Sequence, residues 1–180
     1  LLLCFLPIAS FAQKVGETLP AWEEGYMDIH HINTGCGECA YIILPDGTTM
    51  LIDAGENKAG NPRHVSPKSN ASRTPGEWIV DYIKTMAPVQ KQKLDYALIT
   101  HFHSDHMGGV LKMKNESGRY YNTGIITVAE NLQIGMLVDR GFPDYNFLVN
   151  TEDKMIKNYF NFLHFTKRKI NVEQFVPGVD

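Results

Sequence analysis

Short apolar blocks alternate with polar breaks over the first third of the chain. Residues 28–34 have β-branched character and residues 40–44 are an almost continuous apolar run, which is typical of strands. Pro45-Asp46-Gly47 is a hairpin signal, and a third strand-like run over 49–52 ends at Asp53. This pattern predicts a three-stranded meander.

The apolar positions then change to helical spacing. Thr74-Pro75-Gly76-Glu77 combines a capping Thr, Pro at the first helical position and Glu three residues after the cap. Apolar residues recur at helical spacing up to Met86, and Pro88 ends the helix. Residues 94–100 then form another strand-like run. Strands and helices therefore alternate, which predicts an α/β fold.

The pattern is weaker in the second half of the chain. It predicts a short helix over 107–114, a short strand over 136–138 and a last strand over 172–176. Between the two strands, Thr151 is expected to cap a helix whose apolar face runs from Met155 to Leu163.

Composition narrows the class of protein. The chain has 180 residues, a formal net charge of -3 and 43% hydrophobic residues. These values exclude disorder, a coiled coil and a polybasic nucleic-acid arm as global descriptions, and they favour a folded domain.

The amino end has the composition of a targeting segment. Residues 1–9 are mostly apolar, and Ser10-Phe11-Ala12 places small residues at the cleavage positions before Gln13. We expect residues 1–12 to be the tail of a signal peptide and the mature protein to be exported, periplasmic or extracellular, without a membrane span. A buried helix or an uncleaved anchor are the alternatives; Pro7 disfavours the helix, and the run is shorter than the roughly 20 residues of a span.

Cleavage would remove Cys4 and leave the pair Cys36 and Cys39. A zinc ribbon needs a second such pair, and a thioredoxin-like site would open a helix, whereas this pair separates two strand-like runs. A small local disulfide and two free thiols are the readings left open.

The residues that could bind a metal are concentrated in one segment, Thr100-His101-Phe102-His103-Ser104-Asp105-His106-Met107-Gly108-Gly109. Residues two apart at a strand end project to the same side, so His101 and His103 can bind one ion. If the chain turns there, Asp105 and His106 can face a second ion. Imidazole and carboxylate ligands suit catalytic zinc, and this interpretation is favoured over a solvated loop or a structural histidine cluster.

Four other histidines are weaker candidates. His30 and His31 are adjacent and face opposite sides of their strand, so at most one could approach the site. His64 lies in the polar loop 56–73, where it could line a cleft. His164 lies in the last helix and is expected to be packed or partly exposed rather than a ligand.

Two segments together resemble the metallo-β-lactamase fold hydrolases. The first is Leu51-Ile52-Asp53-Ala54-Gly55, which closes the predicted meander, and the second is Ile99 to Gly109, which follows a helix and a strand. Within them, Asn33 to Ala40, followed by Pro45-Asp46-Gly47, is similar to the ComEC-like branch, which has a Gly-x-Gly-Asp/Glu turn there. The resemblance spans about residues 27–109.

This resemblance implies a four-layer αβ/βα sandwich with a zinc site at the edge of two facing sheets. His101 and His103 would ligate a first ion, and Asp105 and His106 a second; manganese or iron are alternatives to zinc. Asp105 and Asp53 would be the catalytic acids, with Asp53 orienting the site. A metal-bound water would attack an ester, amide or phosphodiester centre.

The family takes further His and Asp ligands from later in its chain, and the residues up to Asp180 lack that pattern. We therefore expect the domain, residues 13–180 after signal cleavage, to be incomplete at its carboxyl end. The function hypothesis is an exported metal-dependent hydrolase acting on a small-molecule or phosphodiester substrate. A non-catalytic metal-binding module, or a mononuclear iron oxygenase that uses His103 and Asp105, are the alternatives. The net charge of -3 lends nucleic-acid binding no support, and the oligomeric state stays open.

Overall fold

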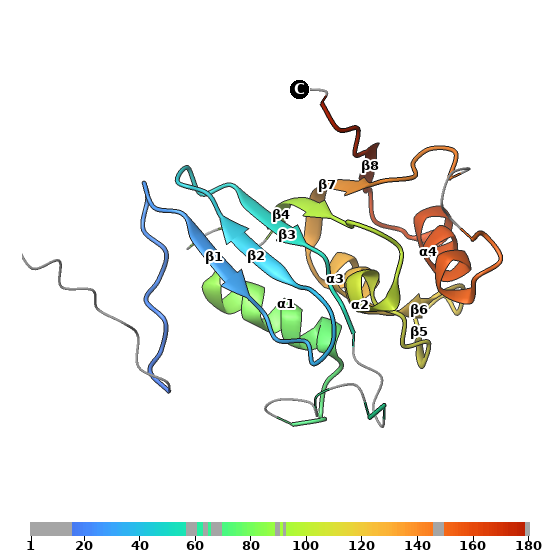
Figure 1. Ribbon diagram of the computed structural model, residues 1–180, viewed down its shortest axis with the longest axis horizontal. Helices are drawn as coiled ribbons and strands as arrows, with labels where there is room; N and C mark the ends of the chain where they lie inside the picture. Colours follow the sequence, from blue (N-terminus) through green and yellow to red (C-terminus); the bar gives the residue numbers. More distant parts are fainter. Residues whose placement is uncertain are drawn as a thin grey trace, which may run out of the picture.

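A six-stranded mixed sheet forms the centre of the protein (Figure 1). The computed structural model describes residues 16–56, 61–62, 65, 70–88, 91, 93–145 and 150–178, so the expected signal segment 1–12 lies outside the described residues. The strand order is β1-β2-β3-β4-β7-β8. The strands of this sheet are β1 (Asp28–His31), β2 (Ala40–Ile43), β3 (Thr49–Ile52), β4 (Lys93–Leu98), β7 (Gln133–Asp139) and β8 (Asn171–Gln174).

The sheet changes from antiparallel to parallel at β3. Strands β1, β2 and β3 pair antiparallel, which confirms the predicted meander, whereas β3, β4, β7 and β8 pair parallel. Parallel neighbours need long connections. Helix α1 (Pro75–Met86) lies between β3 and β4, and helix α3 (Gly124–Asn131) lies between β4 and β7. A small hairpin of β5 (Met113–Lys114) and β6 (Tyr121–Asn122) precedes α3.

Helix α1 begins as its sequence predicts. Thr74 is the N-cap, the Glu77 backbone N–H donates to its hydroxyl, and the Glu77 carboxylate accepts from the Thr74 N–H at 2.7 Å. This reciprocal pair satisfies two of the N–H groups that a helix start leaves unpaired.

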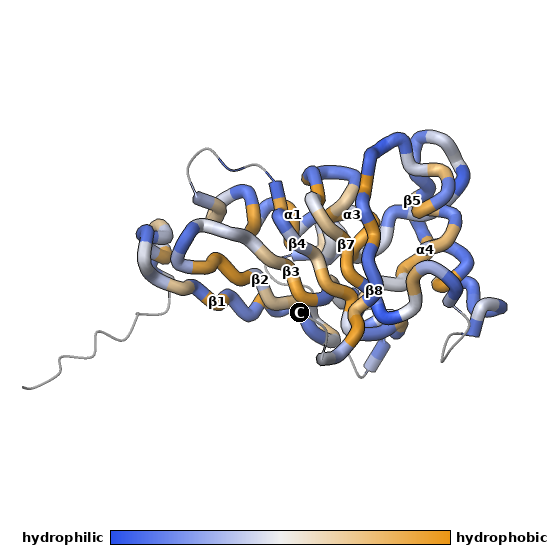
Figure 2. The backbone as a smooth tube through the Cα atoms, turned by 90° about the horizontal axis from the view of Figure 1, so that it is seen from above, coloured by the Kyte–Doolittle hydropathy of each residue, from blue (hydrophilic) through white to orange (hydrophobic). Residues whose placement is uncertain are grey.

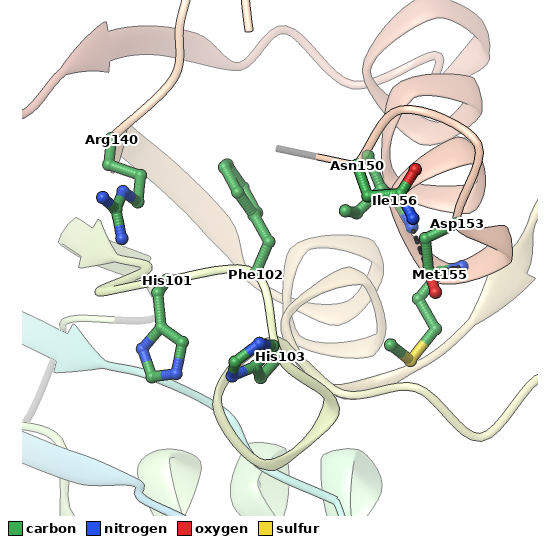
Figure 3. A pocket seen from close by; sticks show the side chains of 8 residues that line it. All are labelled: His101, Phe102, His103, Arg140, Asn150, Asp153, Met155 and Ile156. Carbon is green, nitrogen blue, oxygen red and sulfur yellow. Dashed lines mark hydrogen bonds between the residues drawn. The ribbon is translucent and has the colours of Figure 1, made fainter. Parts of the chain in front are cut away.

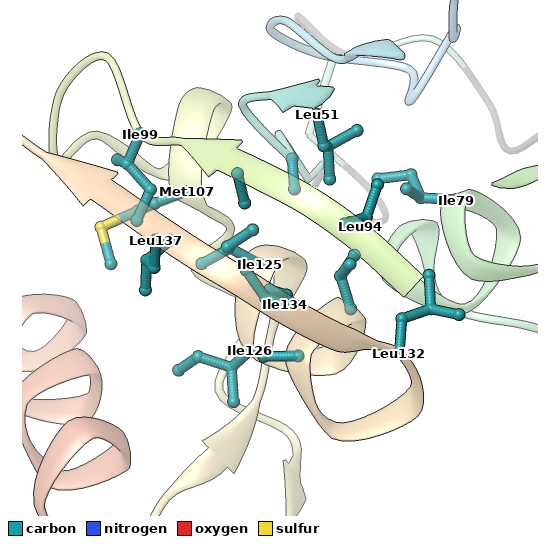
Figure 4. Close-up of a cluster of buried hydrophobic side chains, with 14 of the residues drawn as sticks. Leu51, Ile79, Leu94, Ile99, Met107, Ile125, Ile126, Leu132, Ile134 and Leu137 are labelled. Carbon is teal, nitrogen blue, oxygen red and sulfur yellow. The ribbon is translucent and has the colours of Figure 1, made fainter. Parts of the chain in front are cut away.

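Helices α1 and α3 cover one face of the sheet. Ile79 of α1 and Ile125 of α3 are fully buried in one cluster with the strand residues Leu51, Leu94 and Leu137 (Figure 4). Along the chain, β2, β3 and β7 are among the hydrophobic stretches, while the connecting loops are largely hydrophilic (Figure 2). The helices are held by this apolar contact, because burying such side chains removes them from water.

The opposite face of the sheet is also apolar but more open. Ile29, Ile42, Met50, Tyr96 and Met136 form one row across five strands, and Ile29 and Tyr96 are 52% and 46% exposed. The predicted α/β class is confirmed. Within the described part of the chain there is one large mixed sheet with α1 and α3 on one face, which is consistent with the four-layer sandwich that the sequence predicts to be incomplete at its carboxyl end.

The prediction of a helix over residues 107–114 is wrong. Helix α2 occupies Ser104–Met107, because Gly108 at φ +85° ends it after one turn. Helix α3 went unpredicted: it is buried on most sides and rich in β-branched residues, so it has no polar face to show a helical period.

Helix α4 (Lys154–Phe165) is where the apolar spacing places it, but its N-cap is Asp153 rather than Thr151. The Asp153 carboxylate accepts from the Met155 N–H at 2.7 Å and the Ile156 N–H at 3.4 Å. Among the residues that the structure describes, no helix combines the length and the apolar character that crossing a bilayer requires.

Candidate metal centre

The parallel pairing of β3 and β4 brings Asp53 and the histidine cluster to one edge of the sheet. Ile52 pairs with Leu98 at the carboxyl ends of these strands. Asp53 follows β3 directly, and His101 comes three residues after β4 ends. In open α/β sheets the carboxyl ends of parallel strands are where ligands bind, so the fold places the cluster at a favourable position.

Backbone hydrogen bonds join three loops at this edge. The Ala54 N–H donates to the carbonyl of His106 at 2.6 Å, and the Glu38 N–H donates to that of Asp105 at 2.9 Å. A Cβ at Gly37, which has φ +81°, would lie 1.7 Å from the Asp105 carbonyl oxygen. Only glycine allows this approach, so the turn after β1 is built to sit directly on the histidine loop.

Asp53 is the buried anchor of the site. Its side chain is 1% exposed and accepts hydrogen bonds from the Thr100 N–H at 2.8 Å, from the Thr100 hydroxyl at 2.7 Å and from His106 Nδ1 at 2.7 Å. Because a carboxylate accepts here, His106 Nδ1 carries the proton, and Nε2 is left with its lone pair. Asp53 therefore orients His106 through its other ring nitrogen.

Three imidazole rings cluster beside this anchor, one pair edge-to-face and the other tilted. The ring centroids of His101 and His106 are 3.9 Å apart, and those of His101 and His103 are 4.7 Å apart. Burial lowers the pKa of His101, and the neighbouring His106 and His103 lower it further. A neutral imidazole is the form that binds metal, so the cluster favours its own ligand state.

Asp105 lies at the open side of the cluster. Its side chain is 45% exposed, and its Oδ2 is 3.8 Å from His106 Nε2. Among the described residues no group of three or more His, Cys, Asp or Glu side chains already converges on a point where a metal could sit. The imidazole rings would have to change orientation for their nitrogen atoms to share an ion.

The donor chemistry of the cluster nevertheless fits zinc. Zinc in proteins takes imidazole nitrogen and carboxylate oxygen, and a metal-binding histidine commonly gives its second nitrogen to a carboxylate. The Asp53–His106 pair has that arrangement. His101, His103, Asp105 and His106 are thus the residues that would hold metal.

Comparison with known families decides the relationship. Residues 33–118 match the family model of the metallo-beta-lactamase superfamily. This part of the chain is similar to the metallo-beta-lactamase superfamily. The matched residues run from the turn before β2 to the loop after β5 and include Asp53 and the whole histidine cluster. No curated protein matches the chain.

The superfamily match supports metal-dependent hydrolysis as a general class of reaction, because domains of this superfamily typically bind metal ions. The roles of His101, His103, Asp105, His106 and Asp53 stay predictions, although all five lie inside the matched segment. The ComEC-like branch likewise stays a prediction.

Beside the superfamily motif, the structure adds a buried acid that went unpredicted. Glu56 is 2% exposed, and its Oε2 accepts from the N–H groups of Gly109 and Val110, both at 3.0 Å. Burial raises the pKa of Glu56, while backbone N–H groups from Gly124, Val110 and Gly109 act against that rise. Glu56 thereby ties the Gly-Gly end of the motif to the end of β3. The sequence did not predict this role, because a Glu at the start of a polar loop has no local pattern that links it to Gly109 and Val110.

A second buried acid, Asp139, holds the loop after β7. Its Oδ1 accepts from the Gly141 and Phe142 N–H groups at 2.8 Å, and its Oδ2 accepts from the hydroxyls of Tyr145 at 2.8 Å and Tyr159 at 2.9 Å. Asp139 is fully buried. Because β7 is parallel to β4, this loop starts at the same sheet edge as the superfamily motif.

A cavity of about 430 Å³ adjoins the cluster (Figure 3). Its walls combine the histidine loop, the start of the loop after β7 and the start of α4. The residues that line it are His101, Phe102, His103, Arg140, Asn150, Asp153, Met155 and Ile156. A substrate could reach His101 and His103 from here, and sequence reasoning named neither Arg140 nor Asn150.

The cysteine pair near the site is free. Cys39 is buried in the core, and burial raises the pKa of its thiol. Cys36 is half-buried; burial raises the pKa of its thiol as well, and the nearby Asp105 adds to this. The sequence left a local disulfide and two free thiols open, and the structure has two free thiols.

His30, His31 and His164 do not join the cluster. His30 packs between Tyr41 and Tyr82, and its Nδ1 is 3.0 Å from the Tyr82 hydroxyl. His31 is exposed on the other side of β1, and His164 is exposed on α4, as expected. His64 lies outside the described residues.

Proposed function

We propose that this protein is an exported zinc-dependent hydrolase that acts on an ester, amide or phosphodiester centre. The observation that carries the proposal is the cluster of three imidazoles at the carboxyl edge of the parallel strands, with His106 oriented by the buried Asp53. The superfamily match over residues 33–118 supports it.

Each residue has a distinct part. His101 and His103 hold the first ion, and Asp105 and His106 the second. Asp53 is a positioning residue, since both of its carboxylate oxygens are engaged within the protein. When bound, zinc lowers the pKa of a water molecule and stabilises the negative charge that develops on the substrate.

The cluster of three histidines also argues against a mononuclear iron oxygenase. A facial triad uses two histidines and one carboxylate, so His103 and Asp105 with one distant histidine would leave the neighbouring rings of His101 and His106 without a role. Turnover that depends on oxygen would revive that alternative.

Metal analysis of the purified full-length protein is the direct test. We expect bound zinc, which the double variant His101→Gln/His103→Gln loses while staying folded. His164→Gln, on the exposed side of α4, is the matched control and should keep the metal. Absence of zinc, manganese and iron from the wild-type protein would contradict the proposal.

Hydrolysis is tested separately from metal binding. The zinc-loaded protein is assayed on 4-nitrophenyl esters, bis(4-nitrophenyl) phosphate and a lactone, with His101→Gln/His103→Gln as the blank. Turnover above the blank supports the enzyme, whereas tight zinc binding without turnover on any ester, amide or phosphodiester favours the non-catalytic module.

Export is tested on the precursor. Residues 1–12 carry the signal features, so expression with an intact amino end should give a mature protein that begins at Gln13 and lies outside the cytoplasm. Amino-terminal sequencing of the secreted fraction checks the site; a protein retained with residues 1–12 attached would contradict the proposal.

A further inference from the structure

Arg140 shares one cavity with the two histidines of the first proposed metal site. It is the first residue after β7, and the cavity of about 430 Å³ is lined by Arg140 together with His101 and His103. Figure 3 shows the guanidinium of Arg140 pointing from the strand end toward His101. The positively charged guanidinium of Arg140 thus lines the same cavity as His101 and His103, where the proposed reaction would occur.

In the part of the chain that the structure describes, no other side chain neutralises this cation. Arg140 is exposed, and none of the ion pairs formed among the described residues involves it. Arg168, by contrast, donates to the carbonyl of Glu130, and Arg73 pairs with Asp81. The guanidinium therefore keeps its hydrogen-bond donors available on the cavity side.

The backbone that carries Arg140 is held on both sides. Before it, the buried Asp139 accepts hydrogen bonds from the N–H groups of Gly141 and Phe142 and from two tyrosine hydroxyls. The carbonyl of Arg140 itself accepts from Gln174 Nε2 at 3.4 Å. Such anchoring lowers the entropy cost of presenting a charged side chain at a fixed place.

The one carboxylate in the cavity wall does not cancel the cation. Asp153 caps α4 and accepts from the Met155 and Ile156 N–H groups, so its charge is directed at the positive end of that helix. Phe102, Met155 and Ile156 form an apolar section of the wall, beside the polar side chains of His101, His103 and Asn150. Phe102 is 7% exposed and Ile156 is 5% exposed. The described lining of the cavity therefore combines one cation that has no ion pair with an apolar section of wall.

We propose that Arg140 determines substrate specificity by binding an oxyanion of the substrate, a carboxylate or a phosphate, while an apolar part of the substrate packs on Phe102 and Ile156. The planar guanidinium suits this task, because it binds either oxyanion through two parallel hydrogen bonds. The inference rests on the proposed hydrolase function for the identity of the ligand as a substrate, and its binding test is independent of turnover.

The test is calorimetric titration of the full chain, with and without zinc, using phenylphosphonate, phenylacetate and the neutral phenylacetamide. We expect the two anions to bind at least about tenfold more tightly than the amide, and Arg140→Gln to remove that preference. Arg140→Lys should keep part of the preference for anions, since lysine retains the positive charge but cannot form the two parallel hydrogen bonds of a guanidinium. Arg119→Gln, which removes the same charge where Arg119 stacks on Phe165, should change nothing.

The outcomes separate the two proposals. Equal binding of anions and amide to the wild type, or an anion preference that survives Arg140→Gln, would overturn the role of Arg140 whatever the metal content. An Arg140-dependent preference for phenylphosphonate assigns phosphate substrates, and one for phenylacetate assigns carboxylates. Absence of zinc and of turnover, with the preference intact, would count against the hydrolase alone.

Discussion

Oδ2 of Asp53 lies 2.7 Å from Nδ1 of His106, although 53 residues separate them in the chain. This contact fixes the tautomer of His106 and presents its Nε2 to the open side of the cluster. Four predictions follow from this site and from the contacts that support its fold.

Asp53→Asn should weaken zinc binding about 10- to 100-fold, the usual effect of removing a carboxylate behind a metal-binding histidine. An amide cannot accept at both of its ends, so His106 loses its preferred tautomer. Asn also tolerates the left-handed backbone of this position, at φ +59°, which keeps strain out of the comparison. Competition with a chelating dye measures the affinity. Asp46→Asn, in an exposed turn, is the control; equal affinities in the two variants would contradict the role of Asp53.

Gly37→Ala should disturb the metal centre from a distant point of the sequence. A Cβ there would collide with the backbone of Asp105, so the turn must move away and break the Glu38 to Asp105 hydrogen bond. Gly25→Ala is matched, because Gly25 has a similar φ of +91° and nothing within 4 Å of its Cβ. Both variants carry the left-handed strain of about 1–2 kcal/mol in the free energy of unfolding. Only Gly37→Ala should also lower zinc affinity; an unchanged affinity would show that the turn does not set the geometry of Asp105.

Asp95 should make the stability of the sheet depend on acid pH. Burial alone would raise the pKa of Asp95, but hydrogen bonds from Lys91, Thr49 and Lys93 outweigh it and lower the pKa to about 2 from an ordinary 3.8. A lowered folded pKa contributes stability that is present above pH 3.8 and is lost as the pH falls toward 2.

Asp95→Asn should therefore cost about 1–2 kcal/mol of unfolding free energy at pH 7 and much less near pH 2. Urea unfolding at several pH values measures this. Asp81→Asn, at the exposed ion pair with Arg73, is the control and should cost under about 1 kcal/mol. A cost for Asp95→Asn that is the same at pH 7 and pH 2 would contradict the assignment.

Tyr159→Phe should destabilise the protein by about 1–2 kcal/mol, because it removes a buried hydroxyl that donates to Asp139 at 2.9 Å. Tyr145→Phe removes the second donor to the same oxygen, at 2.8 Å. Since both donors serve one buried carboxylate, the double variant should lose more stability than the sum of the singles. Urea unfolding of the four proteins closes the cycle; simple additivity would show that Asp139 does not couple the two tyrosines.

Sequence alone determined the features whose signals are local. Three such features are the capping box of Thr74 and Glu77, the hairpin at residues 45–47 and the helical spacing of α4. Each depends only on residues a few positions apart, and the same local patterns form the same structures in other proteins. The candidate ligands from His101 to His106 were readable for the same reason, as six consecutive residues hold all four. Helix α3 was missed because its burial, and not its own periodicity, decides its structure.

Only the tertiary structure decided how these pieces meet. The parallel register of β3 and β4 brings Asp53 to His106, and the turn at Gly37 rests on Asp105 because a glycine there leaves room for a backbone. Arg140 enters the same cavity because β7 runs parallel to β4. Contacts between residues that lie this far apart in the chain leave no local pattern, since strand pairing and helix packing across the whole domain create them.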